Sequence, residues 1–147
     1  MNSVTARKIA DEAISWVGTP YRHSCMQKGR GVDCARFAIR PYQAAGLIEE
    51  GVQVPIIARD RLLAGEKVDP DLFRNFILRY AVQIPFESRA VADLVTFFVL
   101  GVESHVGIIV ERDPDYFVDA VSRSRVRKRR LALVPSVAAV YRHKDLI

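Results

Sequence analysis

The period of the hydrophobic pattern changes once along this sequence, close to Pro85. Before Pro85, apolar residues recur at helical spacing in three segments. After it, short β-branched and aromatic runs are separated by Gly, Pro and acidic residues. Helices followed by strands, rather than an alternation of the two, predict an α+β fold with N-terminal helices packed on a C-terminal antiparallel sheet. No repeat or linker divides the chain, so we expect one domain spanning residues 1–147.

The element boundaries follow from capping and turn residues. Ser3 is a plausible cap for a first helix, Asp33 for a second that stops at Gly46, and Asp69-Pro70 for a third that runs to residue 80. Strands are expected over the following ranges: 94–100, 105–110, 116–120, 126–131 and 138–141.

Several function classes are disfavoured by composition. No apolar run reaches the ~18–20 residues that cross a bilayer, so no membrane span is expected. The first residues carry no signal-peptide hydrophobic region, and we expect synthesis without an export signal. Cys25 and Cys34 lie nine positions apart, which matches neither a zinc-ligand spacing nor a C-x-x-C redox pair. No metal or cofactor is expected.

Much of the positive charge is concentrated in one stretch near the C-terminal end, formed by Arg123, Arg125, Arg127, Lys128, Arg129 and Arg130. Without these six residues the net charge of +5 becomes −1, so the basicity is local. The stretch is either a solvated strand or turn, or a surface for an anionic partner. Because no aromatic residues are interleaved with it, a specific nucleic-acid partner is the least favoured interpretation.

Cys34 follows the expected helix cap Asp33 by one residue. At that place the backbone N–H groups and the helix dipole favour a thiolate, which makes Cys34 a candidate nucleophile. The alternative is that Cys34 is an ordinary small core residue.

His105 and Asp119 carry the groups that a nucleophilic cysteine needs. His105 opens an apolar run after a loop, so its ring would lie at a strand end within reach of a helix terminus. Asp119 lies on the next expected strand, where its carboxylate could orient the imidazole. Each also has a simpler explanation, as a structural histidine and as an acidic side chain facing water. His143, near the end of the chain, is expected to be solvated.

Four segments, in this order, resemble the NlpC-type family of cell-wall cysteine peptidases. They are Gly18-Thr19-Pro20-Tyr21-Arg22-His23, Gly31-Val32-Asp33-Cys34, Ala92-Asp93-Leu94-Val95-Thr96-Phe97 and Ser104-His105-Val106-Gly107-Ile108. Each segment is short, but the ordered set spans most of the chain.

The resemblance implies a circularly rearranged papain-like fold and cleavage of peptidoglycan stem peptides, usually at the γ-D-glutamyl bond to the diamino acid. It implies that Cys34 is the nucleophile, His105 the base and Asp119 the third polar residue. Tyr21 matches a tyrosine that lines the substrate cleft, although a tyrosine after Thr-Pro can simply pack a turn. The implied reaction needs no metal and no cofactor.

The sequence departs from the family pattern in three ways. Arg36 stands where a small residue is usual, two places after the nucleophile. Val91-Ala92 replaces the usual Pro-Gly before Asp93, and Asp119 stands where many relatives have histidine. The first departure bears on substrate preference and the last on the orienting role.

The long separation of Cys34 from His105 and the ending Ala138-Ala139-Val140-Tyr141-Arg142 look like phage or prophage tail-associated members of the family. We therefore expect a protein made in the cytoplasm, carried on a virion with phage tail proteins as partners, and acting on the cell wall. A cytoplasmic enzyme that recycles wall peptides fits the same composition. The alternative from a different class is a non-catalytic structural component of a phage tail that uses the same fold.

Overall fold

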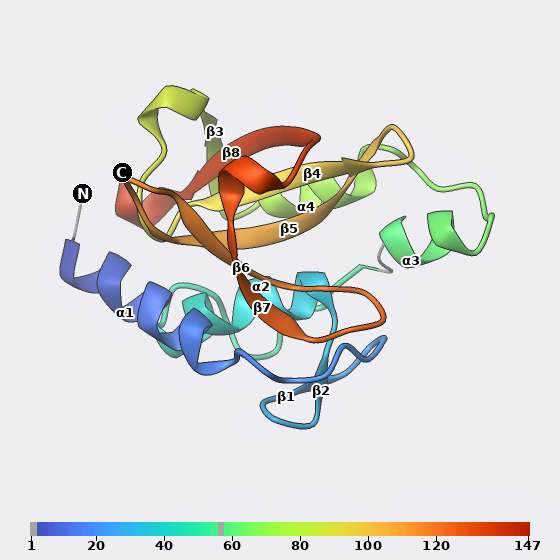
Figure 1. Cartoon of the computed structure of the whole chain (residues 1–147), viewed down its shortest axis with the longest axis horizontal. Coiled ribbons are helices and arrows are strands. Elements are labelled where there is room, and N and C mark those ends of the chain that lie inside the picture. Colours follow the sequence, from blue (N-terminus) through green and yellow to red (C-terminus); the bar gives the residue numbers. More distant parts are fainter. Residues whose placement is uncertain (1–2, 56–57) are drawn as a thin grey trace.

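The computed structural model describes residues 3–55 and 58–147 (Figure 1). The helices occupy the first half of the chain: α1 (Ser3–Ser15), α2 (Cys34–Ala44), α3 (Ala58–Leu63) and α4 (Leu72–Leu78). A small antiparallel hairpin joins α1 to α2 and consists of β1 (Met26–Gln27) and β2 (Gly31–Val32). Short 3₁₀ helices in the described part of the chain are Phe86–Ser88, Leu131–Leu133 and Lys144–Leu146.

The second half forms a six-stranded antiparallel sheet in the order β3-β8-β4-β5-β6-β7. Its strands are β3 (Ala81–Ile84), β4 (Leu94–Val99), β5 (Val102–Glu111), β6 (Tyr116–Ala120), β7 (Val126–Arg130) and β8 (Val137–His143). The predicted α+β arrangement, with helices first and the sheet after them, is confirmed. The last strand lies inside the sheet, between β3 and β4, rather than at an edge.

Most predicted elements are present, with three differences. The strand expected over residues 116–120 is observed with the same bounds as β6, whereas β3 and α3 have no counterpart in the prediction. The third expected helix begins at Leu72 as α4, later than predicted, because Asp69 accepts a hydrogen bond from the Asp71 backbone N–H (2.9 Å) in a local turn. Asp69 and Pro70 therefore precede the helix instead of starting it.

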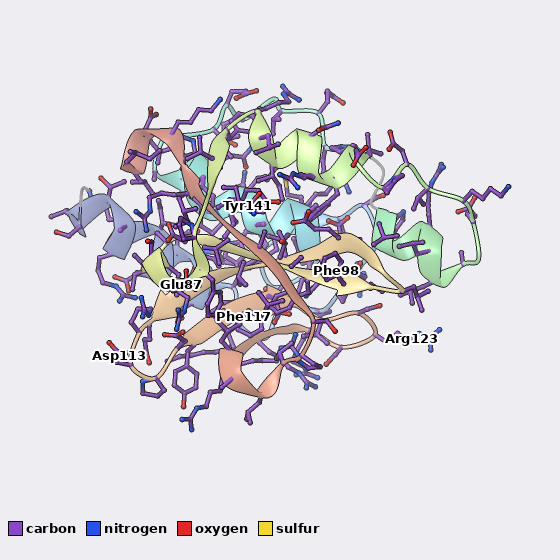
Figure 2. All side chains as sticks on the ribbon, turned by 90° about the horizontal axis from the view of Figure 1, so that it is seen from above. Glu87, Phe98, Asp113, Phe117, Arg123 and Tyr141 are labelled. Atoms are coloured by element: carbon purple, nitrogen blue, oxygen red, sulfur yellow. The ribbon has the colours of Figure 1, made fainter. Side chains whose placement is uncertain are left out.

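Both faces of the sheet carry buried apolar residues. Alternate residues of each strand point to opposite faces. One side packs against α1 and α2, which cover it in Figure 1. On this side, Ile108 of β5 belongs to the same buried cluster as Trp16 and Phe37 from the helical layer. The neighbouring Ile109 faces the other side, in a cluster completed by Val95, Phe97, Phe117, Leu131 and Val140. In Figure 2 the side chain of Phe117 lies within the molecule, whereas Arg123 lies at its periphery.

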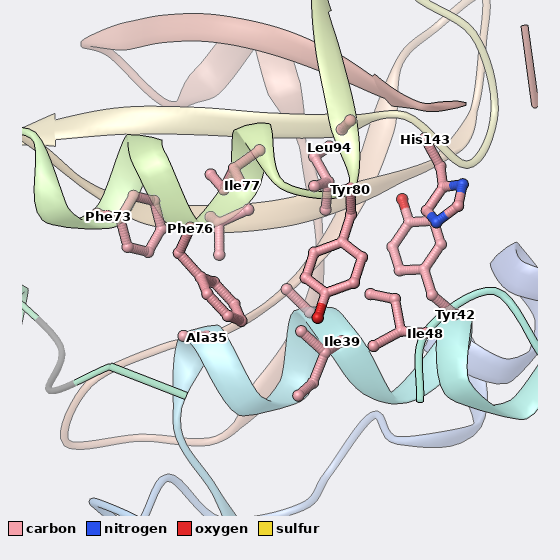
Figure 3. A pocket seen from close by; sticks show the side chains of 13 residues that line it. Ala35, Ile39, Tyr42, Ile48, Phe73, Phe76, Ile77, Tyr80, Leu94 and His143 are labelled. Atoms are coloured by element: carbon pink, nitrogen blue, oxygen red, sulfur yellow. The ribbon is translucent and has the colours of Figure 1, made fainter. Parts of the chain in front are cut away.

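A small apolar cavity of about 40 Å³ lies between α2, α4 and the sheet (Figure 3). His143 lines it and stacks on Tyr42, with ring centroids 5.8 Å apart. The His143 ring donates from Nε2 to the Leu47 carbonyl (2.9 Å) and accepts at Nδ1 from the Asp145 backbone N–H (3.1 Å). The expectation that His143 is solvated is therefore wrong. It is a buried structural residue.

No helix within residues 3–55 and 58–147 is long and apolar enough to cross a membrane.

Candidate active site

The start of α2 is built around Asp33, as the sequence predicted. The Asp33 Oδ1 atom accepts a hydrogen bond from the Arg36 backbone N–H (2.9 Å), three residues into the helix. This contact satisfies one of the backbone donors that a helix start leaves without an intrahelical partner. Cys34 is the first residue of the helix. It therefore lies where the positive end of the helix dipole favours a thiolate.

The other oxygen of Asp33 joins two neighbours to the cap. Oδ2 accepts from the Ser24 backbone N–H (2.8 Å) and from the Arg36 guanidinium (2.7 Å). The loop before β1 is thereby tied to the head of α2. Arg36, which replaces the small residue usual in the family, thus serves as the counter-ion of the cap.

His105 and Asp119 meet on adjacent strands. The Nε2 atom of the His105 ring lies 2.7 Å from Oδ2 of Asp119. His105 is 5% exposed and Asp119 is fully buried, so the interaction is shielded from water. The predicted contact across the sheet is present, and the view that Asp119 faces water on an exposed strand is wrong.

Cys34 and the His105–Asp119 pair belong to elements that pack on one another. The helix α2 contacts both β5, which carries His105, and β6, which carries Asp119. Cys34 is fully buried in the helix-side cluster with Val106 and Val118, whereas the His105 ring contacts Phe97 of the other cluster. The helix that begins at Cys34 therefore packs on the two strands that bear His105 and Asp119.

Asp119 has a second partner that the sequence did not indicate. Arg129 on β7 donates from Nε to Asp119 Oδ1 (3.0 Å) and from its Nη2 to Oδ2. Burial alone would raise the pKa of Asp119, but hydrogen bonds and charge from His105 and Arg129 outweigh it, so the pKa lies below the usual carboxyl range. Asp119 is therefore held as a carboxylate.

Arg129 lies inside the basic stretch, which the sequence predicts to be either solvated or a surface for an anionic partner. Within that stretch, Lys128 pairs with Glu111 (2.7 Å) and Arg127 donates to the Ser124 hydroxyl (2.7 Å). Arg127 and Arg129 alternate on one face of β7. Only the pairing of β6 with β7 shows that Asp119 lies on the same face.

Tyr21 lies next to the segment that leads into Cys34. It forms an isolated parallel bridge with Val32, two residues before Cys34, and its backbone N–H donates to the Ser124 carbonyl (3.0 Å). Its side chain is half-buried against the helix-side core. This place is compatible with a cleft residue and with a turn-packing residue.

Val91-Ala92, which stands where the family pattern has Pro-Gly, has an unusual backbone conformation. Ala92 has a φ of 76°, a left-handed conformation that favours glycine. It is held by burial and by the Tyr42 hydroxyl, which donates to the Ala92 carbonyl (2.5 Å). A left-handed backbone is therefore found at the position where the family pattern has glycine.

No group of three or more His, Cys, Asp or Glu residues that could hold a metal ion occurs in the described ranges 3–55 and 58–147.

Neither a protein-family model nor a curated protein matches this sequence. Solved structures are similar in fold. NlpC2 from Trichomonas vaginalis superposes with a TM-score of 0.69 at 15% identity, over 95% of this chain and 47% of its own. An NlpC/P60 family protein from Bacillus cereus gives a TM-score of 0.67 at 18% identity, over 94% and 40% of the two chains. The NlpC/p60 domain of the peptidoglycan hydrolase SagA gives 0.62 at 17% identity, over 93% and 97%.

These matches establish the class of fold: a papain-like α+β arrangement shared with NlpC/P60 proteins. The chain spans less than half the length of the first two of these structures.

Proposed function

We propose that this chain is a cell-wall hydrolase, a cysteine endopeptidase that cleaves the stem peptides of peptidoglycan at the γ-D-glutamyl bond to the diamino acid. One observation carries the proposal: Cys34 begins a capped helix that packs on the two strands bearing the buried His105–Asp119 pair. The structural likeness to NlpC/P60 proteins, of which SagA is named a peptidoglycan hydrolase, supports the substrate class. We propose that residues 1–147 form one catalytic domain.

The proposed mechanism follows from the tautomer of His105. Because Asp119 is a carboxylate, Nε2 of His105 carries the proton that Asp119 accepts, and Nδ1 acts as the base. His105 takes the thiol proton, and the Cys34 thiolate attacks the amide carbonyl. The Cys34 backbone N–H at the helix start stabilises the oxyanion. His105 then protonates the leaving amine, and water hydrolyses the thioester. Tyr21 is proposed to line the substrate cleft.

A second candidate is the non-catalytic component of a phage tail. It is favoured by the complete burial of Cys34, and by the cavity of Figure 3 being lined by neither Cys34 nor His105. For turnover, the Cys34 sulfur must become accessible to a peptide carbonyl. A structural component would have no such requirement.

Digestion of purified peptidoglycan and of a stem tetrapeptide separates the two candidates. Fragments identified by mass spectrometry should end at the γ-D-glutamyl bond, and Cys34→Ala should abolish their formation. Cys25→Ala is the matched control, because Cys25 is partly exposed and has no proposed role. Intact substrate after incubation with the wild-type protein would favour the structural component.

We further propose that the protein is carried on a phage tail, on the sequence resemblance described above. Mass spectrometry of purified virions from the source lysogen should then detect the chain together with tail proteins. Its detection only in the host cytoplasm would favour the recycling of wall peptides instead.

A further inference from the structure

The carboxylate of Asp119 is shared between two basic side chains. His105 contacts Oδ2 from one side (2.7 Å), while Arg129 reaches Oδ1 through Nε (3.0 Å) and Oδ2 through Nη2. Asp119 is fully buried, and the Arg129 side chain is 30% exposed. One buried anion therefore has two potential cations as partners, and of these the guanidinium stays charged whereas the imidazole can be neutral.

An aromatic pair supports both ends of this network. Phe97 and Phe117 lie with ring centroids 5.2 Å apart. The His105 ring lies 5.7 Å from Phe97, and the Arg129 guanidinium lies 5.2 Å above Phe117. The four side chains and Asp119 come from four adjacent strands, β4 to β7. The guanidinium is thus fixed by stacking as well as by its hydrogen bonds.

The strands approach closely beside this network. A Cβ atom added to Gly107, on β5, would lie 2.7 Å from Cδ2 of Phe117 and 3.1 Å from Cβ of Asp119. Only a residue without a side chain leaves room for Phe117 and Asp119 there. The close approach of β5 at Gly107 therefore limits how far the Asp119 side chain can move relative to His105.

We propose that Arg129 is a positioning residue, which aims the Asp119 carboxylate at His105 and limits the basicity of the imidazole. The proposal rests on the function proposed above. A guanidinium that binds a carboxylate through two nitrogens sets the orientation of the carboxylate plane. It also shares the negative charge, so the imidazolium is less strongly stabilised than it would be beside an Asp119 with no second cation.

Arg127, the cross-strand partner of Asp119 on β7, is a further charged residue beside this network, but it is exposed and donates to the Ser124 hydroxyl (2.7 Å). On β4, the neighbour of the His105 ring is the uncharged Phe97. On β5 itself, the Glu103 carboxylate accepts from the hydroxyls of Thr96 (2.5 Å) and Tyr141 (2.7 Å). Asp119 and Arg129 are the charged groups joined to His105 by a continuous set of contacts.

The test compares Arg129→Gln and Arg129→Lys with the control Arg127→Gln. Arg127 lies two residues away on the same face of β7 and is the cross-strand partner of Asp119, but it is exposed and donates to Ser124 rather than to the carboxylate. The pKa of the His105 ring is measured by NMR titration in the full chain, and kcat and KM are measured on a stem peptide. The NMR readout does not depend on turnover.

Arg129→Gln should raise the pKa of His105 by about one unit, because the imidazolium becomes the remaining counter-ion of the buried carboxylate. It should also lower kcat roughly tenfold, with KM little changed, as expected for a group that orients a catalytic residue. Arg129→Lys keeps the charge but not the planar fork. It should leave the pKa of His105 near its original value and still lower kcat. Arg127→Gln should change neither quantity.

A folded Arg129→Gln protein with an unchanged pKa of His105 would overturn the proposal, as would an equal shift in Arg127→Gln. Should Arg129→Gln not fold, Arg129→Lys decides: wild-type kcat overturns the positioning role, and a lowered kcat at an unchanged pKa supports it. Should the wild-type protein cleave no peptide, the proposed function fails. The NMR shift in Arg129→Gln then supports, and its absence overturns, the coupling of Arg129 to His105.

Discussion

Two buried aspartates, Asp93 and Asp119, are held in nearly the same way and differ in one partner. Both are fully buried. Arg142 contacts both oxygens of Asp93, at 2.9 and 2.8 Å, just as Arg129 contacts both oxygens of Asp119. The third partner of Asp93 is the Ala90 backbone N–H (2.7 Å), whereas the third partner of Asp119 is the His105 ring.

The difference separates a structural ion pair from one that can take part in proton transfer. Neither partner of Asp93, a guanidinium and a backbone N–H, changes its protonation state across the physiological pH range, so this group only ties the turn before β4 to Arg142 on β8. The imidazole next to Asp119 can exist in a protonated and a neutral form, and the neutral form can accept a proton. A buried aspartate–arginine pair therefore does not by itself indicate a functional site. The feature that distinguishes Asp119 is its third partner, the His105 ring.

The largest effect should come from Asp119. We expect Asp119→Asn to lower kcat/KM for a stem peptide, and Asp119→Ala to lower it further, by roughly 10²–10⁴-fold in total, because the base loses its orienting carboxylate. His105→Ala should cost at least as much, since Asp119 acts only through His105. Asp93→Asn is the matched control and should keep its turnover per folded molecule. Near-normal turnover by a folded Asp119→Ala protein would reduce the site to a Cys34–His105 dyad.

Asp93 should matter for stability instead. Asp93→Ala removes the counter-ion of a mostly buried guanidinium, and we expect the free energy of unfolding in urea to fall by about 3–5 kcal/mol. Activity per folded molecule should stay unchanged below the unfolding transition. A loss of kcat in fully folded protein would show that the two aspartates are not functionally distinct.

The low pKa of Asp119 predicts an acid dependence of stability. Because the folded-state pKa is depressed, the stabilisation is fully present above the unfolded value of about 3.9 and is lost as the pH falls through the folded value. In urea unfolding at pH 7, 5 and 3, Asp119→Asn should therefore flatten the acid side of the stability profile, by on the order of 1 kcal/mol. Parallel profiles for the two proteins would contradict the ionised state of Asp119.

The smallest effect concerns the turn beside Asp93. Ala92 has a positive φ, so Ala92→Gly should relieve backbone strain and stabilise the fold by less than about 1 kcal/mol, as measured by thermal unfolding. Ala90→Gly, two residues away, has no such strain to relieve and should be neutral or slightly destabilising. Equal shifts in both variants would argue against strain at Ala92.

Local features of the fold were predictable from the sequence. Asp33 caps α2, Gly46 follows its end with a φ of 76°, and β6 has the predicted bounds. Such features depend on residues close together in the chain, because a cap needs only a side-chain acceptor three residues from its donor. The resemblance of short ordered motifs also indicated the papain-like fold before any strand pairing was known.

Local patterns in the sequence therefore predict the helix that presents Cys34, the α+β class and the candidate residues His105 and Asp119. Which side chains meet depends on the tertiary structure. It inserted β8 between β3 and β4, buried His143 under α2, and brought Arg129 from an apparent surface stretch onto Asp119. The physical reason is that strand order and register are set by the packing of a whole buried sheet, and no local pattern around Arg129 encodes the partner that this packing supplies.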